Sequence, residues 1–161
     1  MIELQPFLEQ VLQNKRMEAN APDIVFNVRP GAKGLKLNAD PLRIQQVLDN
    51  LLSNAMKFTD PAGYIEVEVA RHNGTLRISV ADDGPGIPKD FQGRVFDAFA
   101  QAETPARRQG GVGLGLAICK SIVEAHGGSI GFTSKEGEGA TFYFDLPLPQ
   151  HNCDRAGKNG R

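Results

Sequence analysis

The sequence contains no tryptophan, no long apolar run and no excess of charge of either sign. The last two absences exclude whole classes of protein. No apolar run approaches the roughly 20 residues of a membrane span, and the start of the chain lacks the features of a signal peptide. A net charge of −1 gives no overall attraction to nucleic acid or to an anionic membrane. The only two cysteines, Cys119 and Cys153, fit no metal or redox spacing. We therefore expect a cytoplasmic protein without nucleic-acid or direct membrane contact.

Hydrophobic spacing predicts three helices along the chain. An amphipathic helix is expected from Leu4 to about Ala19. A second runs to about Phe58, opened by Asp40 as N-cap and by a proline at the first helical position. A third runs from about Val112 to His126 and ends at a glycine pair, a common C-terminal signal. Cys119 lies in the apolar pattern of this helix and is predicted to be a core residue.

Strands are predicted from alternating apolar residues. One covers residues 24–28, with residues 35–38 as a candidate partner across a Pro-Gly turn. Residues 64–70 and 76–80 form a predicted hairpin around Asn-Gly, and residues 129–134 and 141–146 form another. Helices beside a mixed, largely antiparallel sheet predict an α+β fold, a two-layer sandwich with the helices on one face. We expect one domain over residues 1–148, followed by a polar, disordered tail over residues 149–161.

The second helix carries a polar stripe. Asn50, Asn54 and Lys57 recur at spacings of four and three residues, which places them on one side of a helix. Structurally, the asparagines could bind neighbouring backbone while the lysine reaches solvent. Functionally, a carboxamide oxygen could bind Mg²⁺ and the ammonium could bind phosphate. The helix by itself leaves both interpretations open.

Two glycine-rich segments follow. Asp82 ends a strand and precedes Gly84, Gly86 and Ile87, so the backbone could approach a flat ligand while the carboxylate accepts a hydrogen bond. Composition alone equally favours a plain turn. Residues 110–116 lead into the third helix, where exposed N–H groups suit phosphate, although the spacing is neither a Walker A loop nor a dinucleotide fingerprint. The irregular stretch between the two segments could be a lid over a nucleotide.

Taken together, these segments resemble the ATP-binding catalytic domain of histidine kinases. Residues 40–59 resemble its N box, residues 80–87 its G1 box, residues 96–99 its F box and residues 110–116 its G2 box. The resemblance covers roughly residues 1–148, including Ile122-Val-Glu-Ala-His-Gly-Gly128 and Gly137-Glu-Gly-Ala-Thr-Phe142. It implies the Bergerat-type ATP-binding sandwich shared with heat-shock-90 chaperones, type II topoisomerases and MutL proteins.

The resemblance also implies roles for individual residues. Asn54 would be the Mg²⁺ ligand, with Asn50 on the phosphate side and Lys57 contacting phosphate. Asp82 would accept a hydrogen bond from the adenine amino group, together with Thr141 and a water. The remaining implied positions are Phe58 and Ile87 at the adenine slot, Gly84 and Gly86 in the adenine loop, the backbone of Gly111, Gly113, Leu114 and Gly115 at the phosphates, and residues 91–110 as the ATP lid.

Two positions depart from the family pattern, and one expected group is missing. Val112 stands where many members have threonine or serine, and Gln101 stands where some have arginine; Arg107 or Arg108 could supply that charge. None of the histidines, His72, His126 and His151, forms the His-Asp/Glu pair of a phosphoacceptor helix. His126 is instead predicted to pack at a helix C-terminus, where a partly positive ring is favoured.

The resemblance therefore implies a protein histidine kinase catalytic domain that uses ATP and Mg²⁺ and acts on a histidine in a separate, dimeric helical domain. A response regulator receiver domain would be an indirect partner, and the isolated domain is expected to be a monomer. One alternative is a degenerate nucleotide-binding regulatory module. Another is an ATPase or serine kinase of the same superfamily, which Asn50 disfavours because heat-shock-90-type ATPases would place a water-activating glutamate there.

Overall fold

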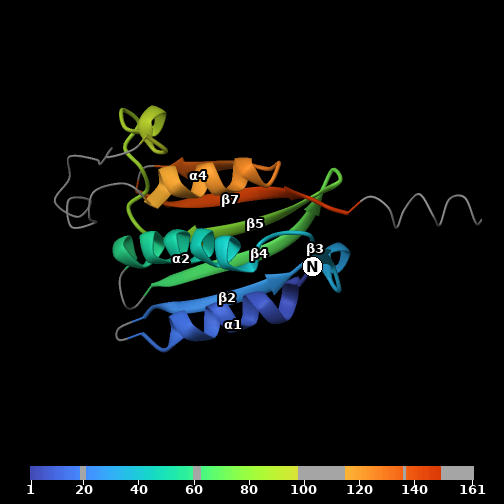
Figure 1. Cartoon of the computed structure of the whole chain (residues 1–161). Coiled ribbons are helices and arrows are strands. Elements are labelled where there is room, and N and C mark those ends of the chain that lie inside the picture. Colours follow the sequence, from blue (N-terminus) through green and yellow to red (C-terminus); the bar gives the residue numbers. More distant parts are fainter. Residues whose placement is uncertain (19–20, 60–62, 98–114, 136, 150–161) are drawn as a thin grey trace, which may run out of the picture.

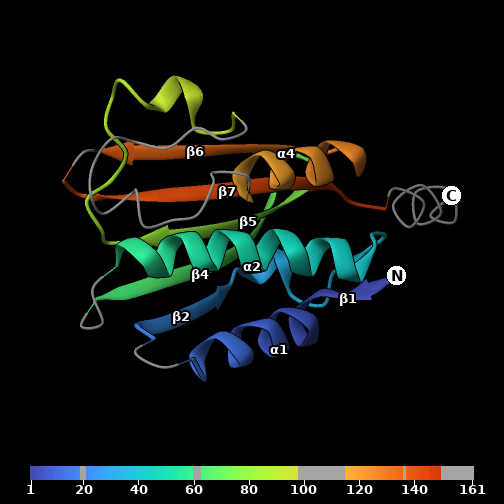
Figure 2. The same ribbon diagram turned by 60° about the vertical axis from the view of Figure 1, so that its left-hand side comes forward.

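The computed structural model describes residues 1–18, 21–59, 63–97, 115–135 and 137–149, and it shows two layers (Figure 1). The helices α1, α2 and α4 lie on one side of a five-stranded sheet, as the turned view also shows (Figure 2). The predicted α+β sandwich is confirmed. The elements with their bounds are β1 (Ile2–Glu3), α1 (Leu4–Arg16), β2 (Asp23–Val28), η1 (Pro30–Ala32), β3 (Lys36–Leu37), α2 (Pro41–Phe58), β4 (Tyr64–His72), β5 (Thr75–Asp82), η2 (Gln92–Arg94), α4 (Gly115–Ala125), β6 (Ser129–Lys135) and β7 (Gly139–Pro147).

The main sheet has the strand order β2-β4-β5-β7-β6. The β4–β5 hairpin turns at Asn73 (φ 49°) and Gly74 (φ 80°), the two positive φ angles that a tight hairpin turn requires. The β6–β7 hairpin is also antiparallel, and β5 pairs with β7 between the hairpins. Only β2 with β4 is parallel. Both predicted hairpins are therefore present, joined into one sheet by pairing that is distant in sequence.

One predicted strand pairing is wrong. The segment after the Pro-Gly turn forms β3, which pairs with β1 in a separate two-stranded sheet and not with β2. The turn itself becomes the short helix η1 and directs the chain away from β2. β2 instead pairs with β4, so its partner is a strand of the main sheet that follows α2.

The core lies between the helices and the inner face of the sheet. Alternate residues of β4, β5 and β7 are buried on the face that the helices cover, and the apolar stripe of α2 is buried as well. Asp40 caps α2 by accepting a hydrogen bond from Leu42 N–H at 3.0 Å, as predicted. Among the described residues, no helix combines the length and apolar character needed to cross a bilayer.

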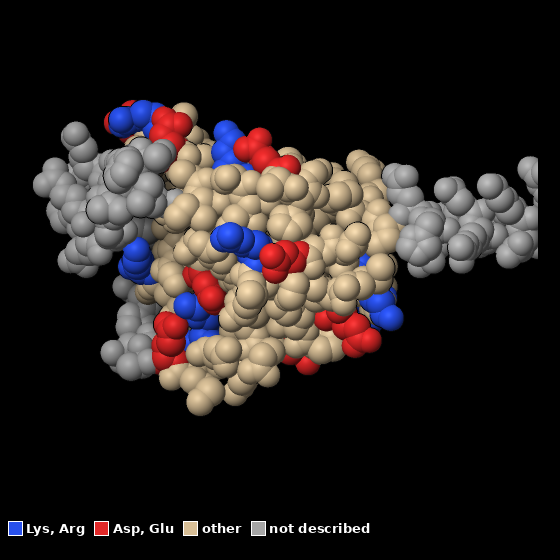
Figure 3. Space-filling view, viewed as in Figure 1, with Lys and Arg blue, Asp and Glu red and all other residues tan. Residues whose placement is uncertain are grey.

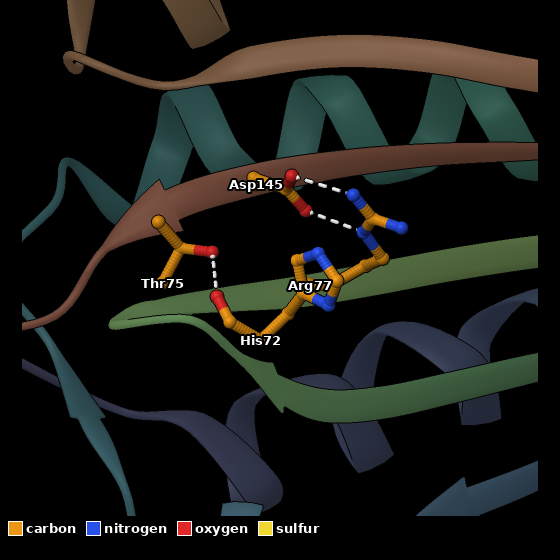
Figure 4. A network of polar contacts seen from close by, with 4 residues as sticks. All are labelled: His72, Thr75, Arg77 and Asp145. Carbon is orange, nitrogen blue, oxygen red and sulfur yellow. Dashed lines mark hydrogen bonds and ion pairs between the residues drawn. The ribbon is translucent and has the colours of Figure 1, made fainter.

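The outer face of the sheet is polar and carries a bidentate ion pair. Arg77 Nε and Nη2 donate to the Asp145 carboxylate at 2.7 and 2.9 Å (Figure 4). The guanidinium also lies 4.1 Å from the ring centroid of Tyr143. These contacts link β5 to β7 on the face opposite α2.

On the face drawn in Figure 3, acidic and basic residues lie side by side among the described residues, without a patch of one sign.

Candidate nucleotide-binding site

The polar stripe of α2 faces away from its buried apolar stripe. Asn50 and Asn54 are half-buried and Lys57, in the last helical turn, is exposed. Their spacing places all three on one side of the helix. Two carboxamides at intermediate depth and a cation at the helix end therefore lie along one side of α2.

Asn50 connects this stripe to the beginning of α4. Its Nδ2 donates to the carbonyl oxygen of Gly115 at 3.4 Å. A Cβ on Gly115 would come within 3.7 Å of Asn50 Cγ, so the amide lies against the glycine backbone. Asn50 and Gly115 are 65 positions apart in the sequence, and the structure brings them together. Asn50 belongs to the helix predicted to bind metal, and Gly115 belongs to the glycine-rich segment predicted to bind phosphate.

The contact between α2 and α4 continues one turn further into α4. Cys119 is completely buried, as predicted, and its thiol donates to the carbonyl oxygen of Val47 at 3.7 Å. Burial raises the pKa of the Cys119 thiol to about 11, an effect opposed by a hydrogen bond from Asn50. The thiol is therefore protonated at neutral pH and serves as a small packing residue beneath Asn50.

Asp82 is the last residue of β5 and lies between Ile65 of β4 and Ala140 of β7. Its Oδ1 accepts a hydrogen bond from Gly84 N–H at 3.0 Å, so the carboxylate closes its own turn. This contact agrees with the plain-turn interpretation and also orients the side chain. By strand alternation, Asp82 points to the same face as buried Ile78 and Val80, which is the helix-covered face.

The loop after Asp82 is held tightly by the β6–β7 turn. Gly86 is buried with φ +77°, and a Cβ there would lie 2.6 Å from the carbonyl oxygen of Lys135. Only glycine fits this close approach. Ile87 is 1% exposed, and its N–H donates to Ser134 Oγ at 2.7 Å. Gly86 and Ile87 are therefore placed by β6 and β7, while Gly84 is held by the hydrogen bond to Asp82.

The structure does not place Thr141 beside Asp82. Thr141 pairs with Ala81 and alternates with Ala140 and Phe142, which are buried on the helix side. Its hydroxyl therefore points to the outer face of the sheet. The residue beside Asp82 on the helix side is Ala140, which has no hydroxyl. The alternation of β7 in the sequence already contained this signal.

The beginning of the predicted lid is packed onto the sheet. Phe91 and Val95 are buried, and η2 lies between them. Phe96, the first F-box residue, has its ring centroid 5.9 Å from that of Phe132 and 6.2 Å from that of Phe142. The start of this segment is therefore an anchored turn, because its aromatic residues extend the core.

Several predicted positions lie outside the described residues, or have undescribed side chains. They are the side chain of Phe58, the glycine-loop residues Gly111, Val112, Gly113 and Leu114, and the lid residues Phe99, Gln101, Arg107 and Arg108. The predictions made for them stay predictions. Gly115, the last residue of that loop to be assigned a role, begins α4.

Two histidines, His72 and His126, lie in the described part of the chain. His126 follows α4; its Nδ1 lies 2.8 Å from the carbonyl oxygen of Ile122, and its Nε2 accepts from Asp40 N–H at 3.2 Å. A tautomer with its proton on Nδ1 satisfies both contacts, so the ring links the end of α4 to the N-cap residue of α2. The backbone of His72 accepts from the Thr75 hydroxyl at 2.6 Å in the β4–β5 turn (Figure 4).

The described residues contain no group of three or more His, Cys, Asp or Glu side chains able to hold a metal ion. A divalent cation here would need carboxamide oxygens of α2 completed by the oxygens of a bound phosphate ligand. Asn54 has the residue type for such a contact, and Asn50 lies one helical turn before it on the same side of α2.

Comparisons with known proteins agree with this geometry. A family model described as "Histidine kinase-, DNA gyrase B-, and HSP90-like ATPase" matches residues 39–150. The alginate biosynthesis sensor protein KinB of Pseudomonas aeruginosa is 38% identical over 146 residues, 91% of this chain and 24% of that protein. The sensor histidine kinase AruS of P. aeruginosa is 52% identical over 111 residues, 65% of this chain and 11% of that protein.

Solved structures give the same result for the fold. The catalytic domain of histidine kinase ThkA has a TM-score of 0.76 at 32% identity, covering 91% of this chain and 93% of that one. A mycobacterial sensor histidine kinase, MprB, has a TM-score of 0.80 at 26% identity, covering 91% and 97%. The chain thus matches nearly whole structures of this kind but spans only a quarter or less of the two curated relatives.

Proposed function

This chain belongs to the histidine kinase-, DNA gyrase B- and HSP90-like ATPase family, and we propose a function for it as an ATP-binding domain of the histidine kinase type. In this proposal the chain binds ATP with Mg²⁺ and presents the γ-phosphoryl group to a histidine of another domain. The observation that carries the proposal is the Asn50–Gly115 contact. This contact holds α2, which would bind the metal, against the first residue of α4, where phosphate would bind.

The catalytic contribution is positioning and charge neutralisation. Asn54 would offer its carboxamide oxygen to Mg²⁺, which neutralises phosphate charge when bound. Lys57, exposed in the last turn of α2, would contact phosphate. Asn50 would stay on the phosphate side, held by Gly115. The backbone N–H groups of Gly111, Gly113, Leu114 and Gly115 would complete the phosphate site.

Adenine would bind at the end of β5. Asp82 would accept from the exocyclic amino group of adenine, while its Oδ1 keeps the hydrogen bond to Gly84 N–H. Buried Ile87 and the ring of Phe58 would line the slot, and Gly86 would let the loop backbone pass close to β6. No adenine contact is proposed for Thr141, whose side chain lies on the other face of the sheet.

Two substitutions test these roles in the purified chain. Asn54→Asp places a negative charge beside phosphate, and Asp82→Asn replaces one acceptor oxygen with a donor amide. Each should weaken binding of a nonhydrolysable ATP analogue about tenfold or more, measured by calorimetry with Mg²⁺. Asn14→Asp on α1 and Asp23→Asn on β2 are matched controls at exposed positions. Wild-type affinity in either site variant, or no Mg²⁺-dependent binding by the parent chain, would refute the assignment.

The rival of a hydrolytic ATPase is disfavoured by the chemistry of α2. Asn50 carries a carboxamide, which cannot accept a proton from water as a carboxylate does. We therefore expect slow hydrolysis by the isolated chain and phosphorylation only when a histidine-bearing helical domain is supplied. Steady multiple-turnover hydrolysis would favour the ATPase, and binding without transfer to a cognate helical domain would favour a regulatory module.

The wider setting follows from the proposed reaction. The phosphoacceptor domain would be dimeric and helical, the response regulator would receive phosphate from it, and the isolated chain would be a monomer. A cytoplasmic location would supply both ATP and reducing conditions. Light scattering of the purified chain tests the monomer, because a stable dimer at micromolar concentration would contradict it. The domain is proposed to end near residue 148, with residues 149–161 as a tail dispensable for nucleotide binding.

A further inference from the structure

Ser134 in β6 joins two segments through a single hydroxyl. Its Oγ accepts from Ile87 N–H at 2.7 Å and donates to the carbonyl oxygen of Gly139 at 3.2 Å. Ile87 belongs to the loop after β5, while Gly139 begins β7. One side chain therefore links the loop to both strands of the β6–β7 hairpin.

The strand register places Ser134 in the same cross-strand row as Asp82. Asp82 pairs with Ala140, and Ala140 pairs with Ser134. Directly paired residues point to the same face of a sheet, so all three side chains lie on the helix-covered side. Ala140 contributes no polar atom to this row. Ser134 is therefore the next hydroxyl along the row from the carboxylate assigned to adenine.

The loop has two further supports from the same hairpin. Gly137 N–H donates to the carbonyl oxygen of Pro85 at 2.6 Å. Gly86 lies so close to β6 that an added Cβ would meet Lys135 O at 2.6 Å and Gly139 O at 3.1 Å. Residues on both sides of Gly86 are thus tied to the hairpin, and the side-chain contribution to these ties comes from Ser134.

We propose that Ser134 is a positioning residue of the nucleotide site, holding Ile87 and the loop after Asp82 in the conformation that receives adenine. The inference rests on the proposed function, since it assigns adenine to this loop. Ser134 acts through Ile87. Without the hydroxyl, the Ile87 N–H loses its acceptor in a half-buried setting, which favours a shifted loop. The loop would then have to be restored at each binding event.

The test compares Ser134→Ala, Ser134→Thr and a control, Ser129→Ala, at the exposed other end of β6. Affinity for a nonhydrolysable ATP analogue is measured by calorimetry with and without Mg²⁺. We expect Ser134→Ala to bind about tenfold more weakly, Ser134→Thr to stay within about threefold of the parent because it keeps the hydroxyl, and the control to be unchanged. The factor by which Mg²⁺ tightens binding should be the same in Ser134→Ala as in the parent chain.

That factor separates positioning from general damage, because the metal residues lie on α2 and do not contact Ser134. Parent-like affinity in Ser134→Ala, equal losses in the alanine and threonine variants, or a lost Mg²⁺ effect would each overturn the proposal. If the parent chain binds the analogue and the alanine variant does so equally well, the inference fails while the proposed function stands. If the parent does not bind, the proposed function fails first.

A measurement on the unmodified chain covers the case in which Ser134→Ala does not fold. Amide hydrogen exchange, followed by NMR without nucleotide, should show Ile87 N–H protected at least about a hundredfold, since the Ser134 hydrogen bond must open before exchange. Exchange of this amide at the rate of an unstructured peptide would overturn the proposal without any variant.

Discussion

Replacing Gly86 with alanine should destabilise the fold and weaken nucleotide binding together, because the loop is wedged against β6. The substitution has two separable costs. The first is conformational, since φ is +77°, a region in which a residue with a Cβ costs roughly 1–2 kcal/mol. The second is steric, since the new Cβ would lie 2.6 Å from the backbone oxygen of Lys135. That oxygen belongs to the paired strands β6 and β7 and cannot retreat without disturbing their register.

The size of each cost can be isolated with two other glycines. Gly34 has φ +75° and nothing within 4 Å of an added Cβ, so Gly34→Ala carries only the conformational cost. Reduced freedom of the unfolded chain offsets part of it, leaving about 1 kcal/mol. Gly93, in η2, has neither a positive φ nor a close neighbour, so its alanine variant should be neutral or slightly stabilised.

Adding the overpacking cost of roughly 1–3 kcal/mol gives Gly86→Ala a total of about 2–4 kcal/mol. Urea unfolding, followed by circular dichroism, measures the free energy of unfolding of all three variants. Affinity for the ATP analogue should fall in Gly86→Ala and stay at the parent value in Gly34→Ala, which lies in the segment before β3. Equal costs for Gly86→Ala and Gly34→Ala would refute the close approach of the loop to β6.

Two further predictions concern groups outside the proposed site. In a Cys153→Ala background, Cys119 should resist thiol reagents at pH 8 in the folded chain. Burial raises the pKa of its thiol from 9.0 to about 11, so the folded state holds the proton more tightly than the unfolded state. The contribution of this thiol to the free energy of unfolding is therefore full below pH 9 and falls by roughly 2–3 kcal/mol by pH 11. Rapid labelling of the folded chain would contradict this burial. Arg77→Gln and Asp145→Asn should each lower the free energy of unfolding by about 1 kcal/mol, because the ion pair is partly exposed on the outer face. A double-mutant cycle should show a coupling between the two residues that weakens as salt is added. ATP affinity should stay unchanged; altered affinity would show that the outer face is connected to the site.

The signals that depend on neighbouring residues predicted much of the fold. The apolar stripe and the Asp40 cap gave the start of α2, and Asn73-Gly74 gave the β4–β5 turn. These signals are reliable because caps, tight turns and amphipathic faces are satisfied within a few residues of the chain. The side of α2 that carries Asn50 and Asn54 was predictable for the same reason.

Pairing between distant segments was not predictable in this way. β3 was expected beside β2, yet it pairs with β1, and β2 finds its partner in β4 beyond α2. A short alternating segment satisfies its backbone hydrogen bonds equally well against several partners, so packing over the whole core decides among them. The resemblance to a family identified the kind of site but did not specify these contacts.

The assignments at the adenine end show the same division at the level of single residues. The family resemblance implies an adenine contact for Thr141, although the alternation along β7 assigns its side chain to the outer face. Ser134 carries no local signal in the sequence, because an isolated polar residue in a strand has many possible roles. By itself the sequence determined which residue types were available at the site. Only the tertiary structure decided that Ser134, Ile87 and Gly139 meet, because hydrogen bonds between distant segments exist only after the strands have taken their register.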